Sequence, residues 1–432
     1  MKTYEETLHW IHELLAFGMK PGLLRMEWML KELGHPEKEL TSIHLAGTNG
    51  KGSTLTYMRC ILQEAGYTVG TFTSPYIERF NERISINGEP ITDEELVMVA
   101  NDVRPIAETL AATDLGTPTE FEVVTILSIV YFARYRKADI ILFETGLGGR
   151  LDSTNVIHPI LTGITNVGYD HTAILGNALH EIAYEKSGII KKGAPLVTGV
   201  EQEEAIQVVE EKAKAKNVPV TRLNKDYFIK GHEVLQDGEL FTLWTQNRTY
   251  ENLHIKMKGF HQVKNAAMGI IMIEVLKEHS EFDIQHNHIQ NGLLQAEWPG
   301  RFEKMSQEPL IILDGAHNKE GIASLRQTLI THYPERRKRM IFSALSDKPV
   351  NEMLSELYDC IDHIMFTSFN FPRASSASSL YDRCIYDSKD LEEDFETALR
   401  KELDRMERED VLIVTGSLYF ISIAREILKN MK

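Results

Sequence analysis

Short apolar runs that alternate with helical patterns are the feature that most constrains the fold of this chain. From about residue 41 to 222, strand-like runs such as "SIHLA", "DIILFE" (139–144) and "PLVTGV" (195–200) are separated by helix-like stretches. One of these, "FEVVTILSIVYFARY", is apolar nearly all round and is expected to be buried. Parallel strands need crossover connections, which helices usually supply. This part of the chain therefore predicts a mostly parallel α/β sheet.

The pattern changes at residues 227–258 and again after "AEWPGRFE" (296–303). "VLQDGELFTLW" predicts a β-hairpin that turns at Asp237-Gly238, and we expect it to form an antiparallel edge to the first domain. A second alternation follows, with "LIILDGAHN", "RMIFSALSD", "HIMFTSFNF" and "DVLIVTGSLYF" as its strands. We therefore predict two α/β domains: residues 1–296, with a P-loop ATPase-like sheet and a small antiparallel edge, and residues 297–432, with a Rossmann-like fold.

Composition excludes several classes of partner. The 432 residues carry a formal net charge of −16, which argues against nonspecific binding to nucleic acid or to an anionic membrane. No apolar run approaches the roughly 20 residues needed to span a bilayer, and the N-terminus is acidic and amphipathic rather than a signal peptide. The three cysteines lack metal-ligand spacing and fit a reducing compartment. We expect a cytoplasmic protein without nucleic-acid or membrane partners.

"HLAGTNGKGST" (44–54) departs from the common phosphate-binding loop, because Gly52 separates Lys51 from Ser53. A predicted strand ends at Ala46 and a predicted helix begins near Ser53, so the glycines lie at a strand-to-helix junction. Backbone N–H groups there can cradle an anion, and Lys51 can neutralise a phosphate. A packing turn is the alternative. We favour a nucleotide site, although this spacing does not fix the family.

Other polar residues follow predicted strands. Glu144 ends one strand beside three glycines, where α/β nucleotide enzymes hold Mg²⁺, although a solvated loop acid is an equal alternative. For His171 a structural role is favoured over metal binding by the residues alone. Asp314 suits either a ribose hydroxyl or a helix N-cap. Taken alone, Lys186 indicates only a solvated basic residue, and Ser74, before Pro75, indicates only a turn.

Together these stretches resemble the folylpolyglutamate synthase/dihydrofolate synthase family, a branch of the Mur ligase superfamily. The resemblance extends over nearly the whole chain and both predicted domains, and the G-T-N-G-K-G-[ST] loop is typical of the family. The matching segments are "KPGLLRM", "HLAGTNGKGST", "TFTSPY", "FNERI", "FETGLGGRLDSTN", "EKSGII", "HQVKNA", "WPGR", "DGAHN" and "TGSLYF".

The resemblance implies a role for each matching residue. The ATP-binding residues would be Gly50, Lys51, Gly52, Ser53, Asn265, Arg301, Asp314 and His317. Ser74 and Glu144 would bind a first Mg²⁺ and His171 a second, near a carbamylated Lys186. The pterin substrate would contact Glu120, Phe121, Glu122, Val123, Leu151, Asp152 and Ser153. Lys51, Lys186, His171 and Arg301 would serve catalysis.

The resemblance also implies a reaction, in which ATP drives the addition of L-glutamate to tetrahydrofolate, and to dihydropteroate, through an acyl phosphate. The protein would act as a monomer. Because Ser153 stands where bifunctional relatives often have Ala, a monofunctional folylpolyglutamate synthase is an alternative, and another amide ligase of the superfamily is a more distant one. Peptidoglycan-precursor ligases are disfavoured, since they carry a large domain before the loop and only 46 residues precede Gly47. A catalytically inactive ATP-binding regulator would not need Lys51, Glu144, His171 and Lys186 together.

Overall fold

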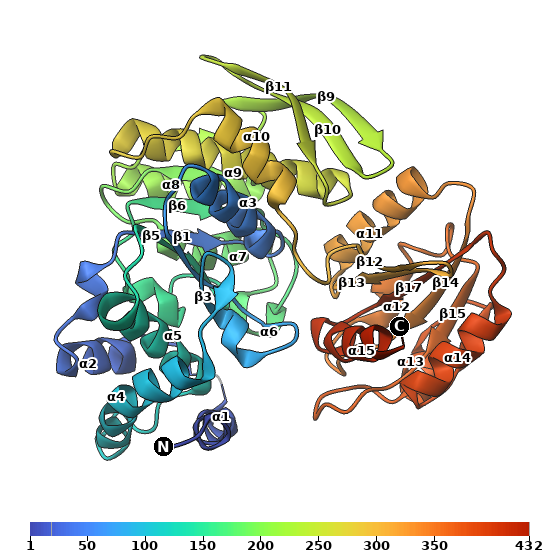
Figure 1. Cartoon of the computed structure of the whole chain (residues 1–432), viewed down its shortest axis with the longest axis horizontal. Coiled ribbons are helices and arrows are strands. Elements are labelled where there is room, and N and C mark those ends of the chain that lie inside the picture. Colours follow the sequence, from blue (N-terminus) through green and yellow to red (C-terminus); the bar gives the residue numbers. More distant parts are fainter. Residues whose placement is uncertain (19, 432) are drawn as a thin grey trace. The chain divides into compact units, whose positions relative to one another are not determined.

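The computed structural model describes residues 1–18 and 20–431, and the chain divides into two compact units (Figure 1). The N-terminal unit comprises Met1–Lys230, Thr242–Leu253 and Lys264–Ala296. The C-terminal unit comprises Gly231–Phe241, His254–Val263 and Glu297–Lys432, so two short segments from before residue 297 belong to it. The limits 1–296 and 297–432 stay a prediction. No helix among the described residues is long and apolar enough to cross a membrane.

The N-terminal unit is built on an eight-stranded sheet with the order β4-β3-β2-β5-β1-β6-β7-β8. Six neighbouring strands run parallel, as the alternating pattern predicts, while β3 and β4 form an antiparallel edge. The strands are β1 (Ser42–Ala46), β2 (Val69–Phe72), β3 (Ile84–Ile86), β4 (Glu89–Pro90), β5 (Ile140–Glu144), β6 (Leu161–Ile164), β7 (Leu196–Thr198) and β8 (Val220–Arg222).

Helices cover both faces of this sheet; Figure 1 shows α3, α9 and α10 on one side and α1, α2, α4 and α5 on the other. Because α5 has apolar residues all round, it is buried in the core between the sheet and α1, α2 and α4. The helices are α1 (Tyr4–Glu13), α2 (Leu24–Glu32), α3 (Lys51–Glu64), α4 (Asp93–Ala111), α5 (Glu120–Val130), α6 (Thr172–Leu175), α7 (Leu179–Lys186), α8 (Glu203–Ala215), α9 (Phe260–His279) and α10 (His286–Gln295).

The predicted hairpin forms, and it belongs to a small antiparallel sheet of its own. β9 (Tyr227–Leu235) and β10 (Gly238–Thr245) turn at Asp237-Gly238, and β11 (Thr249–Ile255) joins them. They make a separate three-stranded sheet with the order β11-β10-β9 rather than an edge of the large sheet. The hairpin sequence specifies the pairing of its own two strands, whereas nothing in it specifies a neighbour beyond them.

The C-terminal unit contains a six-stranded sheet with the order β12-β13-β17-β14-β15-β16, in which only β12 is antiparallel among the described strands. The four predicted strands are present, whereas β12 and β16 were missed. The strands are β12 (Glu303–Gln307), β13 (Leu310–Asp314), β14 (Arg337–Phe342), β15 (His363–Phe366), β16 (Lys389–Leu391) and β17 (Asp410–Thr415).

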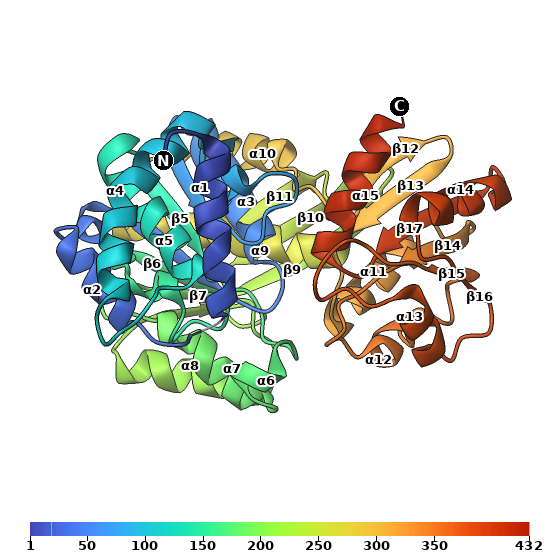
Figure 2. The ribbon, with the colours of Figure 1, turned by 90° about the horizontal axis from the view of Figure 1, so that it is seen from below.

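Both faces of this second sheet are buried, as the continuous apolar strands predict (Figure 2). Along β13, Leu310 and Ile312 pack into the core under one set of helices, while Ile311 and Leu313 pack into the other. The first set is α11 (Lys319–His332), α12 (Val350–Leu354) and α13 (Ala377–Arg383); the second is α14 (Phe395–Arg405) and α15 (Leu418–Asn430). The strand ends thereby present polar residues at one edge of the sheet.

Candidate active site

The glycine-rich loop lies between β1 and α3, and its backbone conformation explains two of its glycines. Gly50 has φ of 83°, and a Cβ there would lie 2.3 Å from Oδ1 of Asn265, on α9. A Cβ at Gly47 would lie 1.8 Å from the Thr165 hydroxyl oxygen. Helix α3 begins at Lys51, two residues earlier than predicted, because Gly50 is its N-cap. The N-terminus of α3, where an anion is favoured, therefore directly follows this loop.

The loop is held by residues that the sequence analysis did not single out. Oδ1 of Asn166, just after β6, accepts hydrogen bonds from the backbone N–H groups of Thr48 (3.2 Å) and Asn49 (2.9 Å). The Thr165 hydroxyl donates to the Asn49 carbonyl oxygen at 2.6 Å. Their only sequence signal is their position at the carboxyl end of a strand next to β1.

Lys51, Glu144 and Ser74 come together at the carboxyl ends of three adjacent strands. The Lys51 ammonium donates to the Gly47 carbonyl oxygen (3.0 Å) and lies 3.7 Å from Oε1 of Glu144. The Ser74 backbone N–H donates to Oε2 of the same carboxylate at 3.4 Å. Glu144 is only 5% exposed. The alternative of a solvated loop acid is therefore wrong for Glu144.

Lys186 is the last residue of α7 and is 3% exposed. Burial, with a further contribution from the charge of Lys51, lowers its pKa to about 7, while Asp170 and Asp152 oppose the shift. Burial therefore favours the neutral amine form of Lys186. The interpretation of Lys186 as a solvated base was wrong, since a single sequence does not reveal that a lysine at the end of a helix is buried.

His171 caps α6 in a left-handed conformation with φ of 51°, and its side chain is 46% exposed. Its backbone N–H donates to Oδ1 of Asp170 at 2.9 Å. Among residues 1–18 and 20–431, no group of three or more His, Cys, Asp or Glu side chains is placed to hold a metal ion. Any metal bound here would need hydroxyl, water or substrate oxygens as well.

The segments predicted to contact the pterin differ in exposure. Glu120 pairs with Arg83 at 2.8 Å and Phe121 packs on the Gly146 backbone, whereas Val123 is fully buried in the core. Glu122 is also buried; its carboxylate accepts from Arg25 and from the Thr119 N–H group.

The "GLGGRLDSTN" loop carries Leu151, Asp152 and Ser153. Burial raises the pKa of the Asp152 carboxyl, and the backbone N–H group of Leu147, which donates to Oδ2 at 2.7 Å, opposes the shift. The backbone of Gly149 lies against the end of α7, where a Cβ would come within 2.8 Å of the Lys186 carbonyl oxygen. The loop is thus in contact with the helix that ends in Lys186.

A second cluster of predicted ATP-binding residues lies within the C-terminal unit. Asp314, at the end of β13, accepts from the N–H groups of Phe302 and Ala316, both at 2.9 Å. Burial raises the pKa of Asp314, and the charges of Arg301 and His317 act against it. The alternative of a helix cap was wrong for Asp314, because Asn318 caps α11 by accepting from the Gly321 N–H group.

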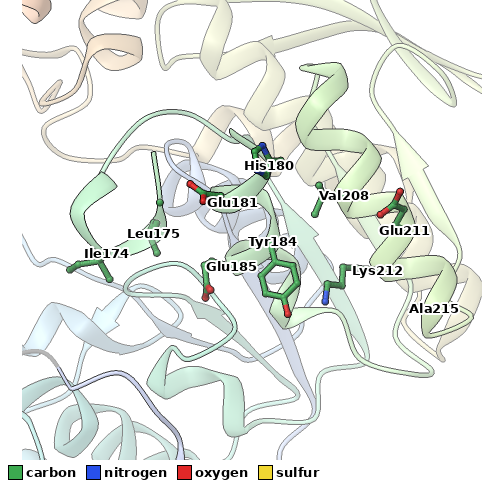
Figure 3. Close-up of a pocket in the computed structure, with 11 residues that line it drawn as sticks. Ile174, Leu175, His180, Glu181, Tyr184, Glu185, Val208, Glu211, Lys212 and Ala215 are labelled. Carbon is green, nitrogen blue, oxygen red and sulfur yellow. The ribbon is translucent and has the colours of Figure 1, made fainter. Parts of the chain in front are cut away.

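A cavity of about 740 Å³ lies between α6, α7 and α8 (Figure 3). The Lys212 ammonium lies 3.8 Å from the centre of the Tyr184 ring on its wall. None of the residues predicted for the active site lines it; the lining residues are Ile174, Leu175, Gly176, His180, Glu181, Tyr184, Glu185, Val208, Glu211, Lys212 and Ala215.

Comparison with known proteins agrees with this arrangement. Residues 45–273 match the Mur ligase middle domain, and residues 300–418 match the Mur ligase, glutamate ligase domain. The chain is 46% identical over 426 residues to the dihydrofolate synthase/folylpolyglutamate synthase of Bacillus subtilis (strain 168), and the match covers 99% of each chain. The chain belongs to this family of Mur ligases.

Other members of the family match equally completely. The folylpolyglutamate synthase of Lacticaseibacillus casei is 34% identical, with 99% of each chain covered. The solved folylpolyglutamate synthase of Mycobacterium tuberculosis, in complex with ADP and AMPPCP, superposes with a TM-score of 0.91 at 27% identity, covering 98% of this chain and 99% of that chain. The resemblance inferred from the motifs and the predicted two-domain α/β class are both confirmed.

Proposed function

We propose that this chain is an ATP-dependent ligase that joins the amine of L-glutamate to the carboxylate of tetrahydrofolates and of dihydropteroate. The observation that carries this proposal is the complete match to a dihydrofolate synthase/folylpolyglutamate synthase at 46% identity, with Lys51 and Glu144 in contact at the glycine-rich loop. A solved complex with AMPPCP and folate, 33% identical with a TM-score of 0.87 over 99% of each chain, supports the two ligand classes.

In the proposed reaction, the substrate carboxylate attacks the γ-phosphorus of ATP and ADP leaves. The glutamate amine then attacks the carbonyl carbon of the acyl phosphate, and phosphate leaves. Lys51 and the N–H groups of the loop would bind the phosphates, with Gly50, Gly52 and Ser53 allowing the close approach. Asn265, which packs on Gly50, would contact ATP from α9. Arg301, Asp314 and His317 would contribute further ATP contacts from the C-terminal unit.

The residues present also fit magnesium. The Glu144 carboxylate is a buried, hard oxygen donor beside Lys51, and Ser74 lies next to it. We propose that Ser74 and Glu144 hold one Mg²⁺ and that His171 contributes to a second site. Bound Mg²⁺ would supply neutralisation of negative charge on the transferred phosphoryl group.

Lys186 fits the proposed carbamylation, because carbon dioxide reacts with a neutral amine and burial gives Lys186 a pKa of about 7.

The pterin would contact the two segments Glu120–Val123 and Leu151–Ser153. We further propose that the chain acts as a monomer. None of the three cysteines forms a disulfide, and a cytoplasmic location stays a prediction.

The acyl phosphate can be tested with a pterin substrate whose carboxylate carries ¹⁸O. The proposed sequence transfers one ¹⁸O atom to inorganic phosphate in each turnover, since the carboxylate oxygen that attacks ATP leaves with the phosphate. Phosphate without ¹⁸O, formed together with the amide product, would contradict this mechanism.

A further inference from the structure

A chain of three buried polar side chains connects the strand before the phosphate loop to the loop after β5. His44 lies in the middle of β1, three residues before Gly47, and is completely buried. Its Nε2 lies 2.7 Å from the Thr154 hydroxyl oxygen, and that hydroxyl hydrogen-bonds to Oδ1 of Asp152. Thr154 is also completely buried, and Asp152 is 5% exposed.

The direction of these hydrogen bonds follows from the number of available protons. Burial, with the nearby charge of Lys191, lowers the pKa of His44 to about 3, so the ring is neutral and has one N–H group. The Thr154 hydroxyl has a single proton, which it donates to Asp152. His44 must therefore donate from Nε2 to Thr154. Its Nδ1 is then a bare acceptor, in agreement with the finding that Nδ1 is buried without a hydrogen-bond partner among the described residues.

The Asp152 carboxylate, which accepts this hydrogen bond from Thr154, also bonds to the backbone of the loop between Leu147 and Thr154. Oδ2 accepts from the Leu147 N–H group at 2.7 Å, and Oδ1 accepts from the Thr154 N–H group at 3.0 Å. The same loop is joined to α7, since the Arg150 N–H group donates to the Glu185 carbonyl oxygen at 2.7 Å. The Asp152 carboxylate therefore joins the two ends of the loop, Leu147 and Thr154.

We propose that His44 and Thr154 are positioning residues for the pterin substrate: they hold Asp152 and its loop in the conformation that binds the pterin. This inference rests on the proposed function. Neither side chain can touch a ligand, because both are completely buried. Their effect must pass through Asp152 and its neighbours Leu151 and Ser153. Since the glycine-rich loop is held separately by Thr165 and Asn166, just after β6, ATP binding should not depend on this chain of hydrogen bonds.

The test compares Thr154→Val, which removes only the hydroxyl from a side chain of the same shape, with Thr154→Ser, which keeps the hydroxyl. Losing a hydrogen bond to a carboxylate should raise the KM for dihydropteroate and tetrahydrofolate by about tenfold or more in Thr154→Val. The KM for ATP should stay within about twofold, and Thr154→Ser should restore most of the pterin affinity. Thr198→Val is the matched control, since Thr198 is also completely buried and its hydroxyl bonds only to backbone groups: it donates to the Ile164 carbonyl oxygen and accepts from the Val200 N–H group.

Pterin affinity is also measured by titration calorimetry, so the inference and the proposed function are tested separately. A wild-type chain that ligates no glutamate contradicts the proposed function, and the calorimetric affinities of the variants then decide the inference. The inference is overturned if Thr154→Val binds pterin as tightly as Thr198→Val does, or if the affinities for ATP and pterin fall together. Should Thr154→Val not fold, His44→Gln, which keeps a donor near the position of Nε2, is compared with His44→Leu, and only the Leu variant should lose pterin affinity.

Discussion

Replacing Lys186 with Met should stabilise the protein while it abolishes ligation. Lys186 is 3% exposed, and burial lowers its pKa from 10.5 to about 7. Between these two pH values the unfolded chain binds a proton that the folded chain does not hold. The free energy of unfolding of the wild type therefore rises with pH across this window. Below pH 7 the folded state must keep a buried ammonium ion, and the free-energy cost of burying Lys186 is greatest there.

The size of the effect follows from these two pKa values. One pKa unit corresponds to about 1.4 kcal/mol, so the cost of Lys186 is about 4 kcal/mol at pH 7 and about 2 kcal/mol at pH 9. Met has nearly the same shape and no charge, and its own contribution does not vary with pH. The free energy of unfolding of Lys186→Met should therefore exceed that of the wild type, by a margin that shrinks by about 2 kcal/mol between pH 7 and pH 9.

Urea denaturation of both proteins in buffer free of carbon dioxide measures this margin without carbamylation. The reasoning would be refuted by a variant that is less stable than the wild type by the same amount at both pH values. That result would mean that Lys186 is charged and paired in the folded protein. Ligation assays on the same samples should show that the more stable variant is inactive.

Three further substitutions test the phosphate-loop site. Lys51→Ala should lower turnover on the order of 1000-fold, because it removes the cation proposed to bind the phosphates, and an unchanged circular dichroism spectrum would confirm the fold; activity near that of the wild type would defeat the role of Lys51. Gly50→Ala should weaken ATP binding, measured by calorimetry, because its Cβ would lie 2.3 Å from Asn265 Oδ1 at a φ of 83°; an unaltered ATP affinity would show that this contact is not needed. Glu144→Gln should raise the Mg²⁺ concentration needed for half-maximal activity by about tenfold or more, since an amide is a weaker ligand than a carboxylate; an unchanged Mg²⁺ dependence would exclude Glu144 as a ligand.

The fold class could be predicted because it depends on periodicity, which is local. The strand at 42–46 is a short apolar run, and α5 belongs to a longer stretch that is apolar nearly all round; their alternation along the chain indicates the α/β class. The separate β9–β11 sheet could not be predicted, since the choice of partner for an edge strand is a tertiary property. β16 was missed because three residues are too few to show a period.

The site was predictable only in part for a similar reason. Lys51 and Glu144 lie at junctions that physical reasoning recognises, and the structure brings them within 3.7 Å of each other. Lys186 and His44 owe their properties to burial, which a single sequence does not reveal. The resemblance to the family singled out Lys186, whereas His44 belongs to a matching motif but was given no role of its own.

The most direct test of the proposed function is incorporation of radiolabelled L-glutamate, with dihydropteroate and tetrahydrofolate offered in separate reactions with ATP and Mg²⁺. We expect ATP-dependent formation of a labelled amide from each pterin. Product from tetrahydrofolate alone would contradict the proposed dihydrofolate synthase activity. Ser153, which stands where bifunctional relatives often have Ala, would then be the first residue to examine. No labelled product from either pterin would contradict the proposed function.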